Sequence, residues 1–308
     1  MPVGLGVDPV AHLGTLSMLR GIGLTVSYVF LAVFAGSLLG WLLSPWLDFE
    51  PGKVISRAVL LFMAVGLVVM WRLSQLNARE LGFVPRPERL AGYLGKGFAL
   101  GLLTLAPVVL FFFVVGFRVR DTSVDLISTD FALQLLSVFV GAVLVGLFEE
   151  TLFRGVLFGA LRRSAGVVVA VVISSVIYAG VHFLRTETEL QDVQWYSGLL
   201  LAWQGLGSLG AALSDWPSAL ALALLGALFC WLRLWFGLWI CIALHAAWVF
   251  GIRLLKEVTV RDVVNPYVGW VGDYDNFVGH LVSIWLIFIF VVLLLYRNWV
   301  QAASAHIK

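Results

Sequence analysis

Three observations predict an all-α, polytopic transmembrane helix bundle with about eight spans. Of the 308 residues, 61% are hydrophobic and only 12% are charged, and the mean hydropathy is +0.99, whereas soluble domains carry about 25% charged residues. Apolar runs of the roughly 20 residues that are needed to cross a bilayer recur along the chain. Only helices and closed barrels satisfy backbone groups in lipid, and these runs are too long for barrel strands.

The first predicted helix covers about residues 18–47, with Trp41 and Trp46 marking its far interface with water. The stretch 77–89 is polar and contains prolines, so it is predicted to be an interfacial loop. We expect residues 1–308 to form one transmembrane domain. The net charge of +2 is too small to suggest a nucleic-acid partner. Further spans are predicted at about 54–76, 93–117, 131–161, 165–184, 217–236, 238–256 and 280–300.

The fourth predicted span contains three charged residues, Glu149, Glu150 and Arg154. A charge at mid-membrane costs roughly 2.5–3.5 kcal/mol on insertion scales, so such groups persist where they face a protein interior or a wet cavity. Residues four apart share a helix face, which predicts that Glu150 and Arg154 pair. Glu149 lies about 100° round the helix from Glu150. We therefore predict that Glu149 is the residue available for chemistry.

Two histidines accompany the glutamates in the predicted membrane region: His182 ends the fifth span and His245 lies inside the seventh. Alone, either histidine is as well explained by a hydrogen bond between helices. A carboxylate in an apolar bundle takes up a proton more readily because its charged form loses hydration. Glu149 is therefore predicted to act as a general base that takes a proton from a water. His182 is predicted either to orient that water or to carry its second proton. His245 is predicted to donate to the oxyanion of an attacked amide.

The order and spacing of these residues resemble the CPBP family, also called the type II CAAX prenyl protease or Abi family of intramembrane endopeptidases. The family pattern is EExxxR, then an aromatic residue four positions before a histidine, then a histidine four positions before Asn or Asp. The matching positions lie within about residues 131–255, which we take as the motif-bearing catalytic core. They are Glu149-Glu150-xxx-Arg154, Tyr178-xxx-His182 and His245-xxx-Val249.

The resemblance implies that Glu149 and His182 activate the hydrolytic water, and that His245 and the residue four positions later stabilise the oxyanion. It implies supporting roles for Glu150, Arg154 and Tyr178. The chain departs from the family at Val249, where valine stands in place of Asn or Asp. Valine has no side-chain donor, so either another group replaces it or activity is weak or lost.

Three alternatives stay open. Zinc held by Glu149, His182 and His245 is an alternative to metal-free hydrolysis, although we favour no metal cofactor. A catalytically weak or inactive membrane scaffold or immunity-type protein is the second hypothesis, and a proton-coupled transporter is the third. The expected partners are the lipid bilayer and a peptide or protein substrate, membrane-anchored or lipidated. By family analogy, the expected location is a bacterial plasma membrane, which the chain crosses several times.

Overall fold

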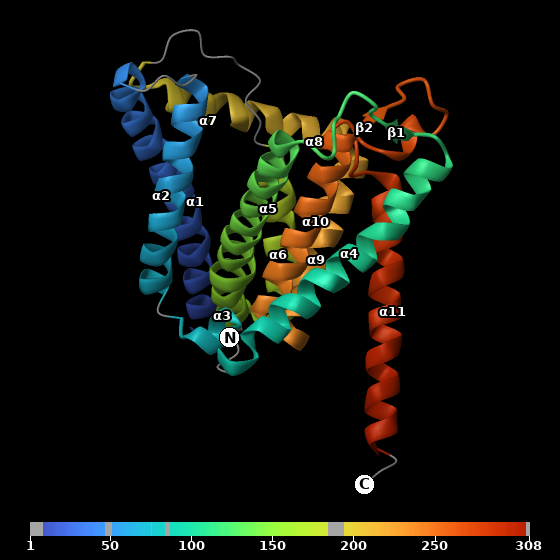
Figure 1. The fold of residues 1–308 in the computed structure, drawn as a ribbon. Coiled ribbons are helices and arrows are strands. Elements are labelled where there is room, and N and C mark those ends of the chain that lie inside the picture. Colours follow the sequence, from blue (N-terminus) through green and yellow to red (C-terminus); the bar gives the residue numbers. More distant parts are fainter. Residues whose placement is uncertain (1–8, 47–50, 75, 84–86, 184–193, 306–308) are drawn as a thin grey trace. The chain divides into compact units, whose positions relative to one another are not determined.

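The structure, a computed structural model, describes residues 9–46, 51–74, 76–83, 87–183 and 194–305 and is almost entirely helical (Figure 1). A helix lies at each of the eight predicted ranges, which confirms the all-α prediction. The elements are α1 (Pro9–Leu43), η1 (Ser44–Trp46), α2 (Pro51–Ser74), α3 (Ala78–Leu81), η2 (Pro87–Arg89), α4 (Leu90–Val114), β1 (Arg118–Arg120), α5 (Thr129–Glu149), η3 (Glu150–Leu157), α6 (Phe158–His182), α7 (Ser197–Gly207), η4 (Ser208–Gly210), α8 (Ala211–Ser214), α9 (Trp216–Phe236), α10 (Leu238–Val258), β2 (Thr259–Arg261), η5 (Val268–Trp270) and α11 (His280–Ala305).

Among the described residues, six helical segments are long and apolar enough to cross a membrane. A shorter apolar stretch, Leu61–Leu73, lies within α2. The chain is thus an integral, multi-pass membrane protein. The six segments are Val26–Trp46, Leu90–Val114, Thr129–His182, Trp216–Phe236, Leu238–Val258 and His280–Arg297.

The segment Thr129–His182 is 54 residues long and covers two predicted spans. At about 1.5 Å per residue it is more than twice as long as the roughly 30 Å hydrocarbon core is thick. Gly166 interrupts it with φ 84° and ψ 174°, a conformation that glycine adopts without strain. This break lies beside the boundary that the sequence predicts between residues 161 and 165.

The motif stretch Glu150–Leu157 is π-helical, between the α-helices α5 and α6. A π-helix forms hydrogen bonds between residues five apart; it occurs mostly as short segments inside α-helices, frequently at functional sites. Its turn is wider than that of an α-helix. The angular spacing that the sequence argument assumed for Glu150 and Arg154 therefore does not hold unchanged here.

The helices form two compact units. The first unit comprises Met1–Pro85 and Thr151–Ala211, and the second comprises Arg86–Glu150 and Ala212–Lys308. The boundary between them passes through the motif itself, between Glu150 and Thr151. The organisation of the chain as one transmembrane domain stays a prediction.

In the first unit, α1 packs closely on α2 through two glycines one turn apart. A Cβ atom added at Gly36 would lie 2.4 Å from the Cα of Val59, and one at Gly40 would lie 2.7 Å from the Cα of Ile55. Small residues with this spacing let membrane helices approach each other closely. The Gly36–Gly40 face therefore explains why α1 and α2 form a tight pair.

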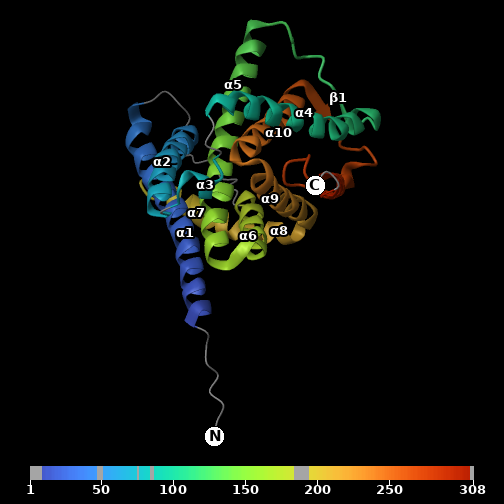
Figure 2. The ribbon, with the colours of Figure 1, turned by 90° about the horizontal axis from the view of Figure 1, so that it is seen from below.

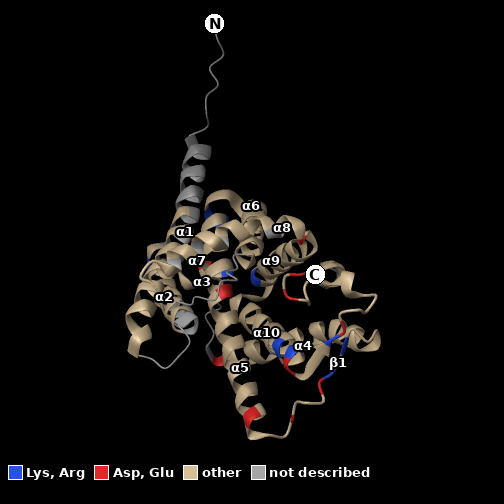
Figure 3. Cartoon of the chain, turned by 90° about the horizontal axis from the view of Figure 1, so that it is seen from above, with Lys and Arg blue, Asp and Glu red and all other residues tan. Residues whose placement is uncertain are grey.

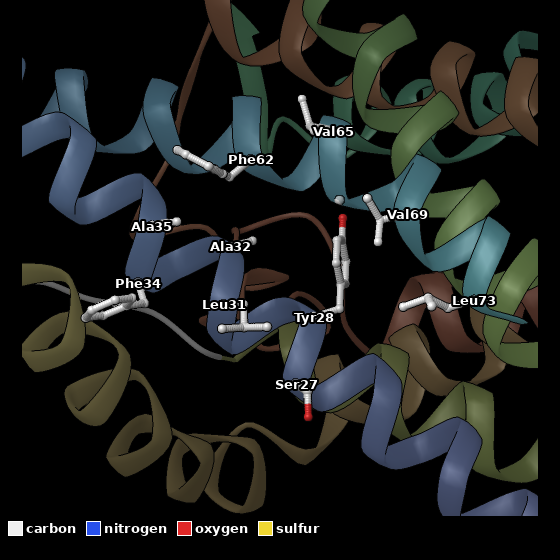
Figure 4. A pocket seen from close by; sticks show the side chains of 11 residues that line it. Ser27, Tyr28, Leu31, Ala32, Phe34, Ala35, Phe62, Val65, Val69 and Leu73 are labelled. Atoms are coloured by element: carbon white, nitrogen blue, oxygen red, sulfur yellow. The ribbon is translucent and has the colours of Figure 1, made fainter.

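An apolar pocket of about 350 Å³ lies between α1 and α2 (Figure 4). The Tyr28 side chain points from α1 toward α2, between Val65 and Val69, and its hydroxyl donates to the carbonyl of Met63. None of the motif residues lines the pocket. We therefore regard it as a packing feature of this helix pair, separate from the predicted chemistry.

In the second unit, α10 lies alongside α4 and α5 (Figures 1 and 2). A Cβ added at Gly101 of α4 would lie 2.5 Å from the Cβ of Ala247. A Cβ added at Gly146 of α5 would lie 2.7 Å from the carbonyl oxygen of Ile242. The α10 helix, which bears His245, is thus in van der Waals contact with α4 on one side and with α5 on another.

We expect Gly146→Ala to destabilise the protein by about 1–3 kcal/mol, because the added methyl group meets the backbone of α10 rather than a movable side chain. The matched control is Gly141→Ala on the same helix, where a Cβ has no neighbour within 4 Å. Thermal unfolding of both variants in detergent measures the difference. Equal midpoints for the two variants would contradict the close approach of α5 to α10.

Candidate functional site

The centre of the candidate site in the second unit is the imidazole of His245, on α10. Its Nδ1 lies 2.8 Å from Oε1 of Glu150, and its Nε2 lies 3.9 Å from Oε2 of Glu149. Glu150 and His245 are both buried. Glu149, the last residue of α5, and Glu150, the first residue of η3, therefore lie near the two nitrogens of one ring.

The two glutamate side chains differ in solvent exposure, and this difference determines which groups each carboxylate can contact. The Glu149 side chain is 29% exposed, whereas that of Glu150 is 0% exposed. Glu149 can therefore meet a water or a substrate, while Glu150 is confined to contacts inside the protein. A buried carboxylate against a histidine typically fixes the orientation and proton position of the ring.

The Glu150–His245 contact also constrains the other ring nitrogen. If Glu150 is ionised, it accepts the Nδ1 proton, and Nε2 carries a proton only when His245 is cationic. If Glu150 is protonated, it donates to Nδ1 of a neutral ring whose proton is on Nε2. In both cases, Nε2 acts as a donor only when the Glu150–His245 pair holds two protons in total, one of them on Nε2.

The His245 ring is packed as well as hydrogen-bonded. It stacks on Phe229 of α9, with ring centroids 5.4 Å apart and an interplanar angle of 25°. One turn toward the end of α10, the Trp248 indole donates to the carbonyl of Gly101 at 2.8 Å and to Thr104 Oγ1 at 2.9 Å. These contacts leave the His245 imidazole little freedom to rotate or shift.

Val249 lies four residues after His245 on α10 and is partly buried. Its neighbour Phe250 packs with Phe98 and Phe139 at centroid distances of 6.2 and 5.7 Å. Because residues four apart on a helix share a face, Val249 lies on the same side of α10 as His245, one turn away. The side chain at that position offers no hydrogen-bond donor.

In the first unit, Arg154, Tyr178 and His182 come together. The guanidinium carbon of Arg154 lies 4.0 Å from the centre of the Tyr178 ring, and both side chains are almost fully buried. This is a cation–π contact, which is stronger when desolvated. Phe153 packs edge-on against Tyr178 at 5.2 Å. The structure thus places Tyr178 directly against Arg154.

His182 is oriented by its own helix. Its Nδ1 lies 2.8 Å from the carbonyl oxygen of Tyr178, and the two rings are 4.4 Å apart. A carbonyl only accepts, so Nδ1 must carry a proton and donate it. In the neutral ring, Nε2 is then the acceptor. This protonation pattern suits a residue that orients a water or receives its proton.

The structure thus brings Glu149, Glu150 and His245 together in one unit, and Arg154, Tyr178 and His182 together in the other. The pairing of Glu150 with Arg154 and the catalytic roles stay predictions. Sequence reasoning missed the contact of Glu150 with His245 and the stacking of Phe229. Phe229 stands in an apolar helix rich in large side chains, and no local signal singles it out.

The zinc alternative requires one carboxylate and two imidazoles around one ion. Its three candidate ligands are divided between the units, with His182 in the first and Glu149 and His245 in the second. In the part of the chain that the structure describes, no three His, Cys, Asp or Glu side chains are grouped so that they could hold a metal ion. Zinc binding therefore stays an untested alternative.

Comparison with protein families matches residues 131–251 to the Rce1-like type II CAAX prenyl endopeptidase family. The match begins at the start of α5 and ends just after Val249, so it contains every candidate site residue. No curated protein and no solved structure matches the chain. Over residues 131–251, the chain is therefore similar to the Rce1-like family of type II CAAX prenyl endopeptidases.

Proposed function

We propose that this membrane protein is an intramembrane endopeptidase that cleaves a membrane-anchored or lipidated substrate by using a water activated by Glu149. The observation that carries the proposal is the placement of Glu149 and Glu150 on the two nitrogens of the buried His245 ring. The family match over the same segment supports it at the level of the CAAX-type endopeptidases.

Glu149 is the proposed general base. As the water oxygen forms a bond to the carbonyl carbon of the substrate, the carboxylate of Glu149 accepts the proton of the water. Its partial exposure supports this role, because a base must be within hydrogen-bond reach of the water that it activates. When the intermediate collapses, the C–N bond breaks and the proton passes to the leaving amine. His182, with Nε2 as an acceptor, is the proposed second proton carrier.

His245 is the proposed oxyanion donor, and Glu150 is its positioning residue. A donor must point at the oxygen on which negative charge develops, and such a donor is worth several kcal/mol in a water-excluded site. The buried Glu150 supports this role by fixing Nδ1 at 2.8 Å, so that a protonated Nε2 faces the side on which Glu149 lies. The stack on Phe229 limits tilting of the ring.

A catalytically weak or inactive scaffold is the second candidate function, and Val249 is the observation that favours it. If the site is an endopeptidase that lacks one oxyanion donor, Val249→Asn should raise kcat by about tenfold or more, because single oxyanion donors contribute at least this much. Val249→Leu is the apolar control. Cleavage rates on one peptide distinguish the outcomes. A variant with Asn that is no faster than the Leu control would favour the scaffold.

Metal removal tests the cofactor alternative directly. With Glu149 as the base and no metal in the reaction, treatment with a chelator followed by desalting should leave the cleavage rate within about twofold of its starting value. A metal-activated water, by contrast, would lose its nucleophile with the ion. Loss of activity that added Zn²⁺ restores would replace the metal-free mechanism with the zinc alternative.

The substrate class is tested in cells. Terminal peptides of membrane proteins are compared by mass spectrometry between cells with the wild type, Glu149→Ala, His182→Ala or no copy of the gene. The proposal expects at least one new terminus that is present only with the wild type. If no terminus depends on Glu149 while Glu149→Ala still rescues the phenotype of the deletion, the endopeptidase proposal fails.

A further inference from the structure

A small two-stranded sheet in the second unit brings two arginines face to face. Strand β1 follows α4, β2 follows α10, and they pair antiparallel with Arg118 directly opposite Arg261. Like charges directly opposite each other on neighbouring strands destabilise a sheet. The fold therefore holds an unfavourable pair of positive charges just beyond the ends of two membrane helices. Figure 3 shows the basic residues at β1.

Arg118 is the more deeply placed of the two, with only 5% of the residue exposed. Its NH1 donates to Thr259 Oγ1 at 3.2 Å, and its Nε has no hydrogen-bond partner among the described residues. A guanidinium has five N–H donors, so most of its capacity is not used by the protein. Burial, and then the charge of Arg261, lower the pKa of Arg118 from its usual value, while Asp275 opposes them.

The nearby carboxylate does not balance the two arginines. Asp275 accepts from Lys256 Nζ at 3.1 Å through Oδ2, and its Oδ1 accepts the backbone amides of residues 277 and 278. Arg261 donates through NH1 to the side-chain oxygen of Asn276, a neutral group. Asp275, the carboxylate that acts on Arg118, is thus already hydrogen-bonded through both of its oxygens.

The opposite face of the sheet is apolar and exposed. Val119 and Val260 are directly paired, and each is 47% exposed. The loop after β2 exposes Val263 and Val264 still further. Alternate residues of a strand point to opposite faces, so the valines and the arginine pair lie on different sides. A sheet with one apolar and one cationic face suits the depth at which acyl chains give way to headgroups.

We infer that the Arg118–Arg261 pair, with Lys256 beside it, binds a phosphate group, that of a phospholipid headgroup in the membrane. A phosphate accepts two parallel N–H bonds from a guanidinium, which suits it to the donors that the sheet leaves available. It also supplies the negative charge that the opposed arginines lack. The partly exposed Arg261 meets the phosphate, and the buried Arg118 adds its positive field from behind.

The test uses the full-length protein in detergent and measures the rise in its unfolding temperature as phosphatidylglycerol, phosphatidylcholine or inorganic phosphate is added. We expect phosphatidylglycerol to stabilise the wild type at lower concentration than phosphatidylcholine. Arg261→Gln should weaken the apparent affinity by about tenfold or more, as expected for one charge-assisted contact. The control is Arg253→Gln, which removes an exposed charge of α10 outside the sheet and should bind as the wild type does.

The arms of the experiment separate the sources of phosphate. If inorganic phosphate stabilises the wild type but not Arg261→Gln, the phosphate site stands and its ligand is the free ion. If phosphatidylglycerol stabilises Arg261→Gln as well as the wild type, or if no phosphate compound stabilises the wild type, the inference is overturned. Arg261 was chosen for substitution because its position is partly exposed, so the variant is expected to fold.

Discussion

Glu149→Gln is expected to lower the rate of peptide-bond cleavage by roughly 10²–10⁴-fold, the contribution of a positioned general base. Glutamine has nearly the same shape but cannot accept the proton of the water. Because the Glu149 side chain is partly exposed and Glu150 holds the buried contact with His245, the substitution should leave the fold intact. Cleavage of a fluorogenic membrane peptide in proteoliposomes measures the rate, and thermal unfolding checks stability.

The matched control for Glu149→Gln is Glu257→Gln, which removes an exposed carboxylate from α10. It should cleave at the wild-type rate. KM should change little in Glu149→Gln, because the base acts in the transition state more than in substrate binding. A Glu149→Gln variant that retains more than about a tenth of the wild-type rate would remove Glu149 from its proposed role as the general base.

His245→Ala is expected to destabilise the second unit by about 3–5 kcal/mol, because it leaves the fully buried Glu150 without its imidazole partner. The same variant should lose activity, since it removes the proposed oxyanion donor. The free energy of unfolding in detergent is the measurement. A cost below about 1 kcal/mol would show that the 2.8 Å contact is not a buried charged pair.

The double variant Glu150→Leu/His245→Leu separates stability from catalysis. Replacing both members of a buried pair by apolar residues of similar volume is often neutral, so most of the lost stability should return. Activity should not return, because the donor is still absent. If the double variant is as unstable as His245→Ala, packing against Phe229 rather than the lost charge pairing accounts for the cost.

The sequence predicted the helices well, because membrane spans depend on a local property. An apolar run of about 20 residues in lipid must satisfy its own backbone, so length and hydropathy are sufficient. The position of the break between the fourth and fifth spans was also predictable. Gly166 stands there with a positive φ, in a stretch that otherwise continues as helix for 54 residues.

The local geometry of the site was less predictable. Helical spacing predicts the pairing of Glu150 with Arg154 only for an ideal α-helix, yet the chain becomes π-helical at Glu150. Composition does not indicate such a change. The contact of Glu150 with His245 joins residues 95 positions apart. Spacing within one helix suggested a partner for Glu150 on that helix and could not indicate one on α10.

The position of α10 shows how little the glycines of a sequence indicate about which helices pack together. Gly101 and Gly146 lie in different apolar runs, and each permits a close contact with α10. A sequence shows that glycines occur in membrane helices, but not which helix each one faces. The small-residue face that brings His245 toward Glu150 therefore became visible only in the folded chain.

The most direct test of the central claim is to follow the oxygen of the water. Purified protein in liposomes is incubated with a membrane peptide in H₂¹⁸O, and newly formed carboxyl termini are analysed by mass spectrometry. Hydrolysis by a water activated at Glu149 predicts one ¹⁸O atom in each new carboxylate with the wild type and no product with Glu149→Gln. Labelled product that forms equally fast with Glu149→Gln, or the absence of any new terminus with the wild type, would contradict it.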